Sequence, residues 1–340
     1  MGPRGPTLRR HLPRAPPGLR RRPLRDGVTV PRPRIVVVSG ATATGKTALA
    51  VDLARALDGE LVGADSVQLY DRLLIGSARP TEEELSGVPH HLLGALDLRA
   101  PYDAAKFIDD ADRAIAGITS RGKTAIVVGG TGLYLRALVK GLATGIPADA
   151  GVRAELHARI AAGDAETLRE MHREVAAVDP EYAARIHVTD PVRIVRALEV
   201  FAVSGLPLSE HHRRHAALGP RYEASWWCLE IERDALRARV VPRTREMLAR
   251  GWVDEVRGIL ADGYEHDLKP LRSVGYAEVV AHLRGELPAR ALSTEIERAT
   301  MSFAKRQRTW FRGEEGVEWL TLEAARERSR WDALSEWLQR

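Results

Sequence analysis

Residues 35–47 read IVVVSGATATGKT, and this stretch decides the fold class. An apolar run from Ile35 to Val38 leads into the pattern G-x-x-x-x-G-K-T, which spans Gly40 to Thr47, and a helix-like sequence follows. Strand, glycine-rich turn and helix in this order are typical of a phosphate-binding loop (P-loop), in which backbone N–H groups and the helix N-terminus face a phosphate chain. The stretch therefore predicts phosphate or diphosphate binding, but it does not define the rest of the ligand.

The loop also carries the charged and polar groups that such a ligand needs. Lys46 supplies a full positive charge, and the hydroxyl of Thr47 can coordinate Mg²⁺. A glycine-rich turn that merely starts a helix rarely has both residues in register. We therefore expect Mg²⁺ as cofactor, with Thr47 as its protein ligand, and diphosphate binding by Gly40, Ala41, Thr42, Ala43, Thr44, Gly45, Lys46 and Thr47.

Composition limits the class of protein. The length of 340 residues suits two domains, or one large domain with an insertion. No apolar run reaches the roughly 18–20 residues of a membrane span, so we expect no membrane partner. A single cysteine, Cys228, excludes a disulfide framework and a Cys-based zinc finger, and it fits a reducing cytoplasm.

The positive charge is concentrated at the N-terminus. The whole chain carries +5, whereas residues 1–34 hold ten Arg and one acid, so the remaining residues carry −4. Residues 1–33 also hold eight Pro, and we expect a disordered Arg/Pro-rich tail. A basic arm on RNA or an organelle transit peptide are alternatives, but a dispensable extension or a misassigned start codon is the preferred interpretation.

The remainder predicts an α/β fold. Strand-like runs at 34–39, 60–64 and 124–129 alternate with helical stretches, which indicates a P-loop NTPase-like parallel sheet flanked by helices. We expect a last strand at 225–231. The predicted helices are 46–57, 103–121, 131–140, 151–162, 164–176, 191–204, 233–249, 251–262, 273–283 and 291–311.

These patterns divide the chain into four parts. They are the tail (1–33), a P-loop α/β core (34–142), a helical insertion (143–215), and a final strand with C-terminal helices that complete the core (216–340). Ligands of such sheets bind at the carboxyl ends of the strands. The P-loop, Asp65 and the segment 129–131 all follow predicted strands, so we expect them to meet at one edge.

Asp65 is the candidate acid of this edge. It is followed by Ser66 and Gln68, and the three side chains can accept a proton, donate and accept hydrogen bonds, and contact the edge of a base such as adenine. The alternative is a helix cap or a residue that supports Mg²⁺ indirectly.

Basic residues gather late in the chain. Residues 298–312 (RATMSFAKRQRTWFR) interleave Lys and Arg with aromatic residues, a pattern that suits RNA. From this segment alone, an amphipathic helix with core aromatics is preferred. The pairs Arg193/Arg196 and Arg239/Arg243 each share a helix face and could meet a phosphate, although a solvated face is again preferred.

Eight segments together resemble the bacterial tRNA dimethylallyltransferases, also called tRNA isopentenyl-diphosphate transferases. They occur in family order over about residues 34–320, and this number of ordered motifs is very specific. The segments are SGATATGKT (39–47), GADSVQLY (63–70), IGSARP (75–80), VPHHLL (88–93), VGGTGLYLRAL (128–138), DPVRIVRALEVF (190–201), LRSVGYAE (271–278) and AKRQRTWFR (304–312).

The resemblance implies a reaction. A dimethylallyl group would pass from dimethylallyl diphosphate to N6 of the adenine on the 3′ side of the anticodon in tRNA, with release of diphosphate and assistance from Mg²⁺. It implies Asp65 as general base, Thr131 as a contact to the reacting nucleotide, Lys46 on the leaving group, and Arg239 on the diphosphate. It also implies that the insertion clamps the anticodon arm of the tRNA. A monomer is expected.

The resemblance further implies a set of tRNA-binding residues. They are Asp65, Ser66, Val67, Gln68, Thr131, Arg153, Val192, Arg193, Ile194, Val195, Arg196, Arg272, Ser273, Val274, Gly275, Tyr276 and Ala277. Some positions depart from the family pattern. Met301 and Ser302 stand where Arg is common, which weakens the case for a tRNA contact there, and Pro242 is expected to kink the helix that carries Arg239.

Two other enzyme classes share parts of the pattern. An isopentenyltransferase that acts on free adenine nucleotides would use the same loop, but it would need no insertion to hold RNA. A P-loop nucleotide kinase would bind ATP instead. A non-catalytic RNA-binding module is disfavoured because Lys46, Thr47 and Asp65 are all present.

Overall fold

The computed structural model describes residues 32–143, 146 and 148–340. The predictions for the basic tail concern residues 1–31 almost entirely and lie outside this range. Within the described residues, no helix has both the length and the hydropathy that crossing a membrane requires.

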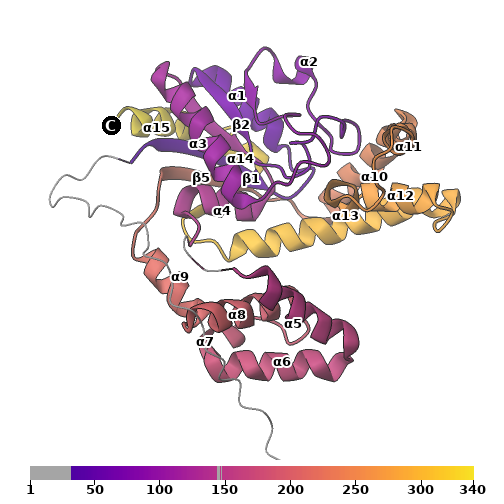
Figure 1. The fold of residues 1–340 in the computed structure, drawn as a ribbon. Helices are drawn as coiled ribbons and strands as arrows, with labels where there is room; N and C mark the ends of the chain where they lie inside the picture. The colour runs from indigo at the N-terminus through magenta and orange to yellow at the C-terminus, as the bar shows by residue number, and fades with distance from the viewer. Residues whose placement is uncertain (1–31, 144–145, 147) are drawn as a thin grey trace, which may run out of the picture. The chain divides into compact units, whose positions relative to one another are not determined.

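A six-stranded parallel sheet forms the centre of the fold, which confirms the predicted α/β class (Figure 1). Its strand order is β3-β2-β4-β1-β5-β6. Consequently the carboxyl ends of β2, β4 and β1 are adjacent, and the loops that follow these strands meet at one edge. The strands are Arg34–Gly40 (β1), Gly59–Gly63 (β2), His90–His91 (β3), Thr124–Val128 (β4), Glu223–Leu229 (β5) and Val317–Leu320 (β6).

Helices cover both faces of this sheet. Ile35 and Val37 of β1 belong to one buried cluster, and Val36 and Val38 belong to a second. Successive side chains of a strand point to opposite faces, so β1 is buried on both sides, as parallel strands are. The first cluster includes α3 (Ala104–Ser120), α4 (Gly132–Lys140) and α13 (Ala289–Arg312), and the second includes α1 (Lys46–Ala56), α2 (Glu82–Leu85), α14 (Leu322–Ala325) and α15 (Arg328–Gln339).

The chain between α4 and β5 is helical, as predicted. Its elements share a small core that contains Met171, Ile194 and Val200. Asp190 caps α8 by accepting a hydrogen bond from the backbone N–H of Arg193, and Gly205 ends that helix with φ = +69°. The helices are α5 (Ala150–Ala162), α6 (Ala165–Val178), α7 (Pro180–Ala183), α8 (Pro191–Ser204) and α9 (Leu208–Ala216).

The helices between β5 and α13 gather at one end of the long helix α13 (Figure 1). Pro242 lies inside α10, and the helix continues through it. The helix expected at 273–283 begins later, because Gly275 has φ = +88° and the helical turns start at Tyr276. These elements are α10 (Arg233–Ala249), α11 (Trp252–Ala261), the 3₁₀ helix η1 (Lys269–Arg272) and α12 (Tyr276–Leu283).

Two strands were not predicted. The strand at 223–229 is not the last, because β6 adds to it in parallel further along the chain. The pair His90–His91 forms β3 beside β2. Both strands are short, and β3 is polar, so neither has the apolar run by which a strand is recognised in sequence.

Candidate active site

The P-loop leaves β1 and enters α1 with a fixed internal structure. Gly45 precedes the helix with φ = +96°, a backbone conformation that favours glycine. The carbonyl oxygen of Ala41 accepts hydrogen bonds from Thr44 Oγ1 at 2.9 Å and from Lys46 Nζ at 2.6 Å. The ammonium group of Lys46 is therefore hydrogen-bonded to the loop itself. An anionic ligand in the loop would replace this hydrogen bond.

The charge of Lys46 depends on its surroundings. Desolvation within the loop lowers the pKa of Lys46 to about 8; the negative charge of Asp65 opposes this change, and the positive charge of Arg243 adds to it. An anion in the loop would stabilise the ammonium form. Binding of diphosphate is therefore expected to raise this pKa.

Asp65 lies two residues beyond the end of β2. Its Oδ1 accepts hydrogen bonds from Val67 N at 2.9 Å and from Gln68 N at 3.3 Å, so the carboxylate caps a turn and not a helix. In the described part of the chain, Oδ2 has no hydrogen-bond partner. One oxygen thus fixes the orientation of the carboxylate while the other is available to a substrate proton.

Thr131 follows β4 and joins that strand end to Asp65. Its Oγ1 accepts a hydrogen bond from Ser66 N at 2.9 Å and donates one to Ser66 Oγ at 3.2 Å. The close approach depends on Gly129, since a Cβ atom there would lie 2.1 Å from the carbonyl oxygen of Ala64. The glycines of this segment are therefore required by packing.

One cavity of about 450 Å³ contains the three predicted loops. Lys46 and Thr47 line it together with Asp65, Gln68 and Thr131. The expected meeting of these loops at one sheet edge is confirmed. Arg272, Ser273 and Val274, from the segment before α12, line the same cavity.

The amide of Gln68 has a fixed orientation. Its Nε2 donates hydrogen bonds to the carbonyl oxygens of Ser77 at 3.0 Å and Ala78 at 3.1 Å. Because both neighbours are acceptors, the nitrogen must face them, and Oε1 remains as a hydrogen-bond acceptor. Gln68 can therefore accept a hydrogen bond from a ligand but has little capacity to donate one.

Two arginines of α10 approach the loop differently. Arg243 lines the cavity, and burial lowers its pKa from the ordinary arginine value. Arg239 lies next to the loop, with Nη1 3.4 Å from the carbonyl oxygens of Ala43 and Thr44, but it is not among the residues that line the cavity. The diphosphate contact predicted for Arg239 stays a prediction, and Arg243 is the better placed of the two.

His90 is a further polar group of the cavity. Neither ring nitrogen has a hydrogen-bond partner within the described residues, and burial, with a smaller effect of His91, lowers the pKa of His90 to about 4. His91 instead contacts Glu60, with Nε2 2.7 Å from Oε2. A neutral imidazole therefore faces the cavity at physiological pH.

A magnesium ion fits the donor set of the loop. Among the described residues, no group of three His, Cys, Asp or Glu side chains could hold a metal ion. In P-loops the Ser or Thr hydroxyl coordinates Mg²⁺, which completes its shell with ligand phosphates and water, so a protein cage is not needed. The hydroxyl of Thr47 in the cavity wall meets that requirement.

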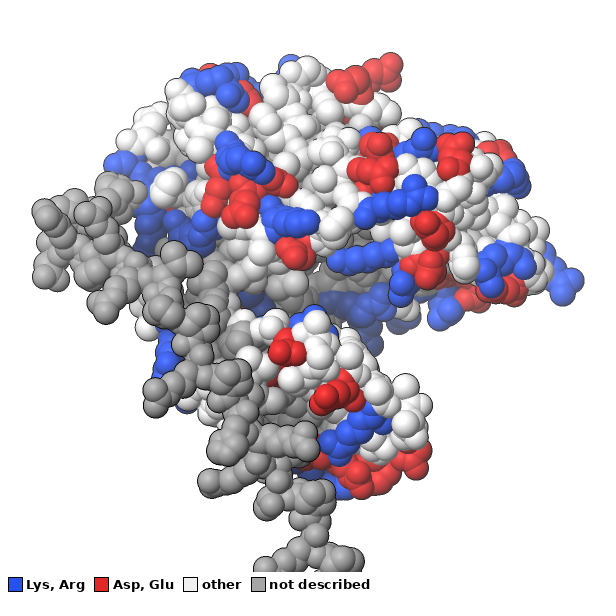
Figure 2. Space-filling view, in the orientation of Figure 1, with Lys and Arg blue, Asp and Glu red and all other residues white. Residues whose placement is uncertain are grey.

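The predicted RNA contacts of the insertion divide into two groups. Ile194 and Val195 are buried, so their side chains pack within the protein, whereas Val192 is 71% exposed. Arg153 and Arg196 both pair with the fully buried carboxylate of Glu199, at 3.0 and 2.9 Å. Figure 2 shows acidic and basic side chains interspersed on the visible face of these helices, which is not a field of one sign.

The segment 298–312 forms the second half of α13. Phe311 is fully buried, and Trp310 stacks with Arg136, whose guanidinium carbon is 4.3 Å from the ring centroid. The preferred interpretation as an amphipathic helix with core aromatics is confirmed for these residues. Phe303 and Arg306 differ, because they line the cavity.

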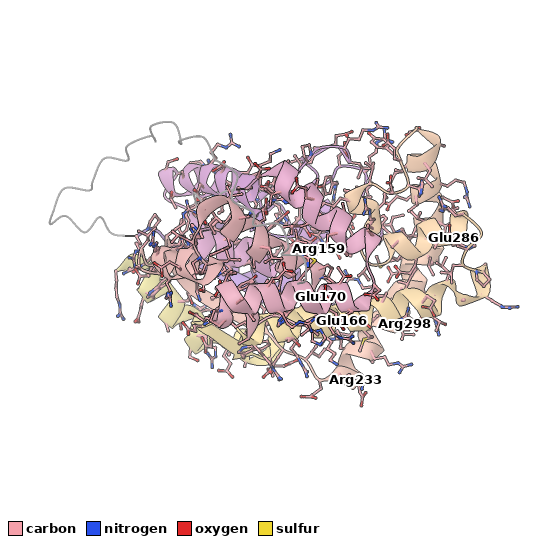
Figure 3. The ribbon with its side chains drawn as sticks, turned by 60° about the horizontal axis from the view of Figure 1, so that its bottom comes forward. Arg159, Glu166, Glu170, Arg233, Glu286 and Arg298 are labelled. Carbon is pink, nitrogen blue, oxygen red and sulfur yellow. The ribbon has the colours of Figure 1, made fainter. Side chains whose placement is uncertain are left out.

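A larger cavity of about 740 Å³ lies between α10 and α13 and shares Ala41 and Thr44 with the P-loop. Arg233 and Arg298, labelled in Figure 3, line it from these two helices. Acidic side chains, Asp234 and Glu297, are part of the same wall. Charges of both signs therefore surround this space.

Sequence reasoning missed several residues that shape the site. No local pattern singles out His90 or Gln307 as an individual site residue. The one available signal is the family resemblance of the motifs that contain them, VPHHLL (88–93) and AKRQRTWFR (304–312). Their contacts join segments far apart in the sequence, and no local pattern encodes such contacts.

Comparison with known proteins identifies the family of the chain. The family model described as IPP transferase matches residues 68–314, and the model described as isopentenyl transferase matches residues 33–99. A tRNA dimethylallyltransferase 1 from Trichlorobacter lovleyi is 46% identical over 85% of this chain and 94% of its own length. The tRNA dimethylallyltransferase of Geobacter metallireducens is 45% identical over 84% and 92%.

Solved structures agree with the sequence relatives. The tRNA isopentenylpyrophosphate transferase of Bacillus halodurans has a TM-score of 0.64 and 31% identity, covering 90% of this chain and 95% of that one. The corresponding enzyme of Staphylococcus epidermidis has a TM-score of 0.65 and 28% identity, covering 91% and 99%. Because the family model matches residues 68–314 and relatives of 45–46% identity cover about 85% of the chain, the chain belongs to the IPP transferase family.

Proposed function

We propose that this protein transfers a dimethylallyl group from dimethylallyl diphosphate to N6 of the adenine on the 3′ side of the anticodon in tRNA. One observation carries the proposal: the diphosphate-binding loop and the carboxylate of Asp65 line the same cavity. The cavity thus offers a cationic cradle for a leaving group and a base for an attacking amine. The tRNA dimethylallyltransferases among its relatives support the choice of substrates.

The bond changes follow from this arrangement. The adenine N6 attacks C1 of the dimethylallyl group, an N–C bond forms, and the bond between C1 and the diphosphate oxygen breaks. One proton of the amine passes to Asp65 Oδ2, whose position is fixed through Oδ1. The negative charge that develops on diphosphate is stabilised by Lys46, Arg243 and the backbone N–H groups of the loop.

The two N–H groups of an exocyclic amine match two acceptors of the cavity. Asp65 Oδ2 would accept one and Gln68 Oε1 the other, because the nitrogen of Gln68 is already engaged by Ser77 and Ala78. A keto group at the same position would face two acceptors and lose both hydrogen bonds. This arrangement favours adenine over guanine.

Mg²⁺, held by Thr47 and the diphosphate oxygens, would add positive charge on the leaving group. The RNA must present the adenine outside its stack, which costs a few kcal/mol. We assign the holding of the anticodon arm to the insertion, through Arg153, Arg193 and Arg196. We further propose that the protein acts as a monomer in the cytoplasm, where its tRNA substrate would be found.

A transfer assay tests the proposal. The full-length protein is incubated with radiolabelled dimethylallyl diphosphate, Mg²⁺ and unmodified tRNA, with AMP as competing acceptor and ATP as competing donor. We expect label in tRNA, lost when the adenine beside the anticodon is replaced. Label in AMP would instead support a nucleotide prenyltransferase, and phosphate transfer from ATP would support a kinase.

A further inference from the structure

Gln307 of α13 connects two loops of the active site. Its Oε1 accepts a hydrogen bond from Thr42 N, in the P-loop, at 2.9 Å. Its Nε2 donates a hydrogen bond to the carbonyl oxygen of Gly130, in the segment after β4, at 2.9 Å. Gln307 is 8% exposed; its hydrogen bond to Gly130 is buried and its hydrogen bond to Thr42 N is partly buried.

Glutamine suits this position chemically. The bridge needs an acceptor for one backbone group and a donor for another, and a primary amide supplies both at the end of one flexible arm. A buried carboxylate could accept from Thr42 N but would repel the carbonyl oxygen of Gly130. An apolar side chain would leave the partly buried Thr42 N and the buried carbonyl oxygen of Gly130 without this partner.

The neighbouring backbone is shaped to admit this amide. A Cβ atom at Gly130 would lie 2.4 Å from Gln307 Nε2, too close for any other residue without displacement of the amide. The bridge also occupies the backbone N–H of Thr42, so this part of the P-loop is held in place by a side chain from α13.

The bridge extends to the proposed base through a short chain of contacts. Gly130 is followed by Thr131, whose hydroxyl accepts the hydrogen bond of Ser66 N beside Asp65. Through this path Gln307 fixes the distance between the loop that would hold the prenyl donor and the loop that would hold the reacting base. Misplacement of reacting groups by about 1 Å can cost about a hundredfold in rate.

We propose that Gln307 is a positioning residue. It holds the P-loop in a fixed position relative to Thr131 and Asp65, as transfer between the two bound substrates requires. The inference deepens the proposed function and rests on it for the identity of the reaction. Its predicted signature is a loss of kcat that exceeds any change in KM for either substrate. Charged and titratable groups that share this cavity are Lys46, Asp65, His90, Arg243, Arg272 and Arg306.

Three variants of the full-length protein test this role. Gln307→Met removes both hydrogen bonds at similar volume, and Gln307→Glu retains the acceptor but loses the donor. Ser293→Ala is the matched control, since it removes a hydrogen bond to Glu297 within α13 and touches neither loop. Steady-state transfer to tRNA and calorimetric binding of inorganic diphosphate are measured for each, with circular dichroism to verify folding.

Gln307→Met is expected to lower kcat about 30-fold while KM for tRNA stays within about threefold. Gln307→Glu gives a second readout, because a protonated carboxyl group both donates and accepts, as the amide does. Burial beside a carbonyl oxygen raises the pKa of such a carboxyl group. The kcat of Gln307→Glu, as a ratio to wild type at the same pH, should therefore rise as the pH is lowered from 8.5 to about 6.

Opposite results would overturn the positioning role. They are a Gln307→Met variant with kcat within twofold of wild type, a loss confined to KM, or a Gln307→Glu ratio that is independent of pH. If wild-type protein does not prenylate tRNA, the proposed function fails. The positioning role is then tested by the binding of inorganic diphosphate alone. Gln307→Met should bind diphosphate at least threefold more weakly than Ser293→Ala does. Equal affinity of the two variants would overturn the positioning role.

Discussion

The phenol of Tyr276 donates a hydrogen bond to Glu255 Oε1 at 2.7 Å and accepts one from Ser77 N at 3.1 Å. The other oxygen of Glu255 accepts hydrogen bonds from Leu74 N at 3.0 Å and Ile75 N at 2.7 Å. A pair of side chains from α11 and α12 thus holds the turn whose carbonyl groups orient Gln68. The acceptor oxygen of Gln68 is therefore oriented by residues that are distant from the P-loop in the sequence.

Tyr276→Phe should weaken this support. The change removes the hydrogen bond that Glu255 Oε1 accepts and leaves Ser77 N without its partner, so we expect the free energy of unfolding to fall by about 1–2 kcal/mol. Tyr264→Phe is a matched control, because its phenol donates to Asp97 at the surface and its loss should cost less than about 0.5 kcal/mol. Urea denaturation of both variants measures the difference. Equal stability of the two variants would contradict the buried role of Tyr276.

Asp65→Asn removes the proposed general base but keeps the hydrogen bonds that cap the turn. An amide oxygen can still accept from Val67 N and Gln68 N, so the fold and tRNA affinity should be retained. It cannot take a proton at neutral pH, and we expect kcat to fall by about 10²–10⁴-fold. Single-turnover transfer and filter binding of tRNA measure the two quantities, and transfer at the wild-type rate would exclude Asp65 as the base.

The pKa of Lys46 predicts how diphosphate affinity varies with pH. Its free-state pKa is about 8, and a bound anion raises it, so binding above pH 8 requires proton uptake. The contribution of Lys46 to affinity should be constant below pH 8 and should fall by about tenfold per unit above it. Calorimetry at pH 8.5–9 in buffers of different ionisation enthalpy counts the protons taken up. Lys46→Arg keeps the charge throughout, and an uptake unchanged in this variant would show that another group is responsible.

Arg243 and Arg239 should contribute unequally to donor binding. Arg243 lines the cavity with Lys46, and loss of a charge-assisted hydrogen bond there should weaken inorganic diphosphate binding by about 10–100-fold in Arg243→Ala. Arg239→Ala removes only long contacts to loop carbonyls and should change affinity by less than about threefold. If Arg239→Ala weakened diphosphate binding more than Arg243→Ala, the result would favour the diphosphate contact that the sequence resemblance implies for Arg239.

The P-loop and the three strands around it were predictable because each is encoded locally. An apolar run and a glycine pattern identify β1 and its loop, and parallel packing then places the loops after β2 and β4 beside it. His90 was beyond this reasoning, since its place in the cavity depends on β3 pairing with β2. A two-residue polar strand has no periodicity from which to predict it.

Contacts between distant segments were also beyond prediction from sequence. Gln307 meets Thr42 across 265 positions of the chain, and Glu255 meets Ile75 across 180. The buried Glu199 is a similar case, because its charge gave no indication that it would anchor Arg153 and Arg196. Such residues look like ordinary polar surface positions until the fold brings their partners together.

The glycine segment after β4 limits how this enzyme can be redesigned. Gly129 packs against Ala64 and Gly130 against Gln307, so neither position can take a larger residue without displacing its neighbour. Neither glycine has a side chain to shorten, so this segment offers no extra space for a prenyl donor longer than the one we propose. Space for bulkier donors must come from the helical wall, where Met247 and Phe303 offer side chains that can be shortened.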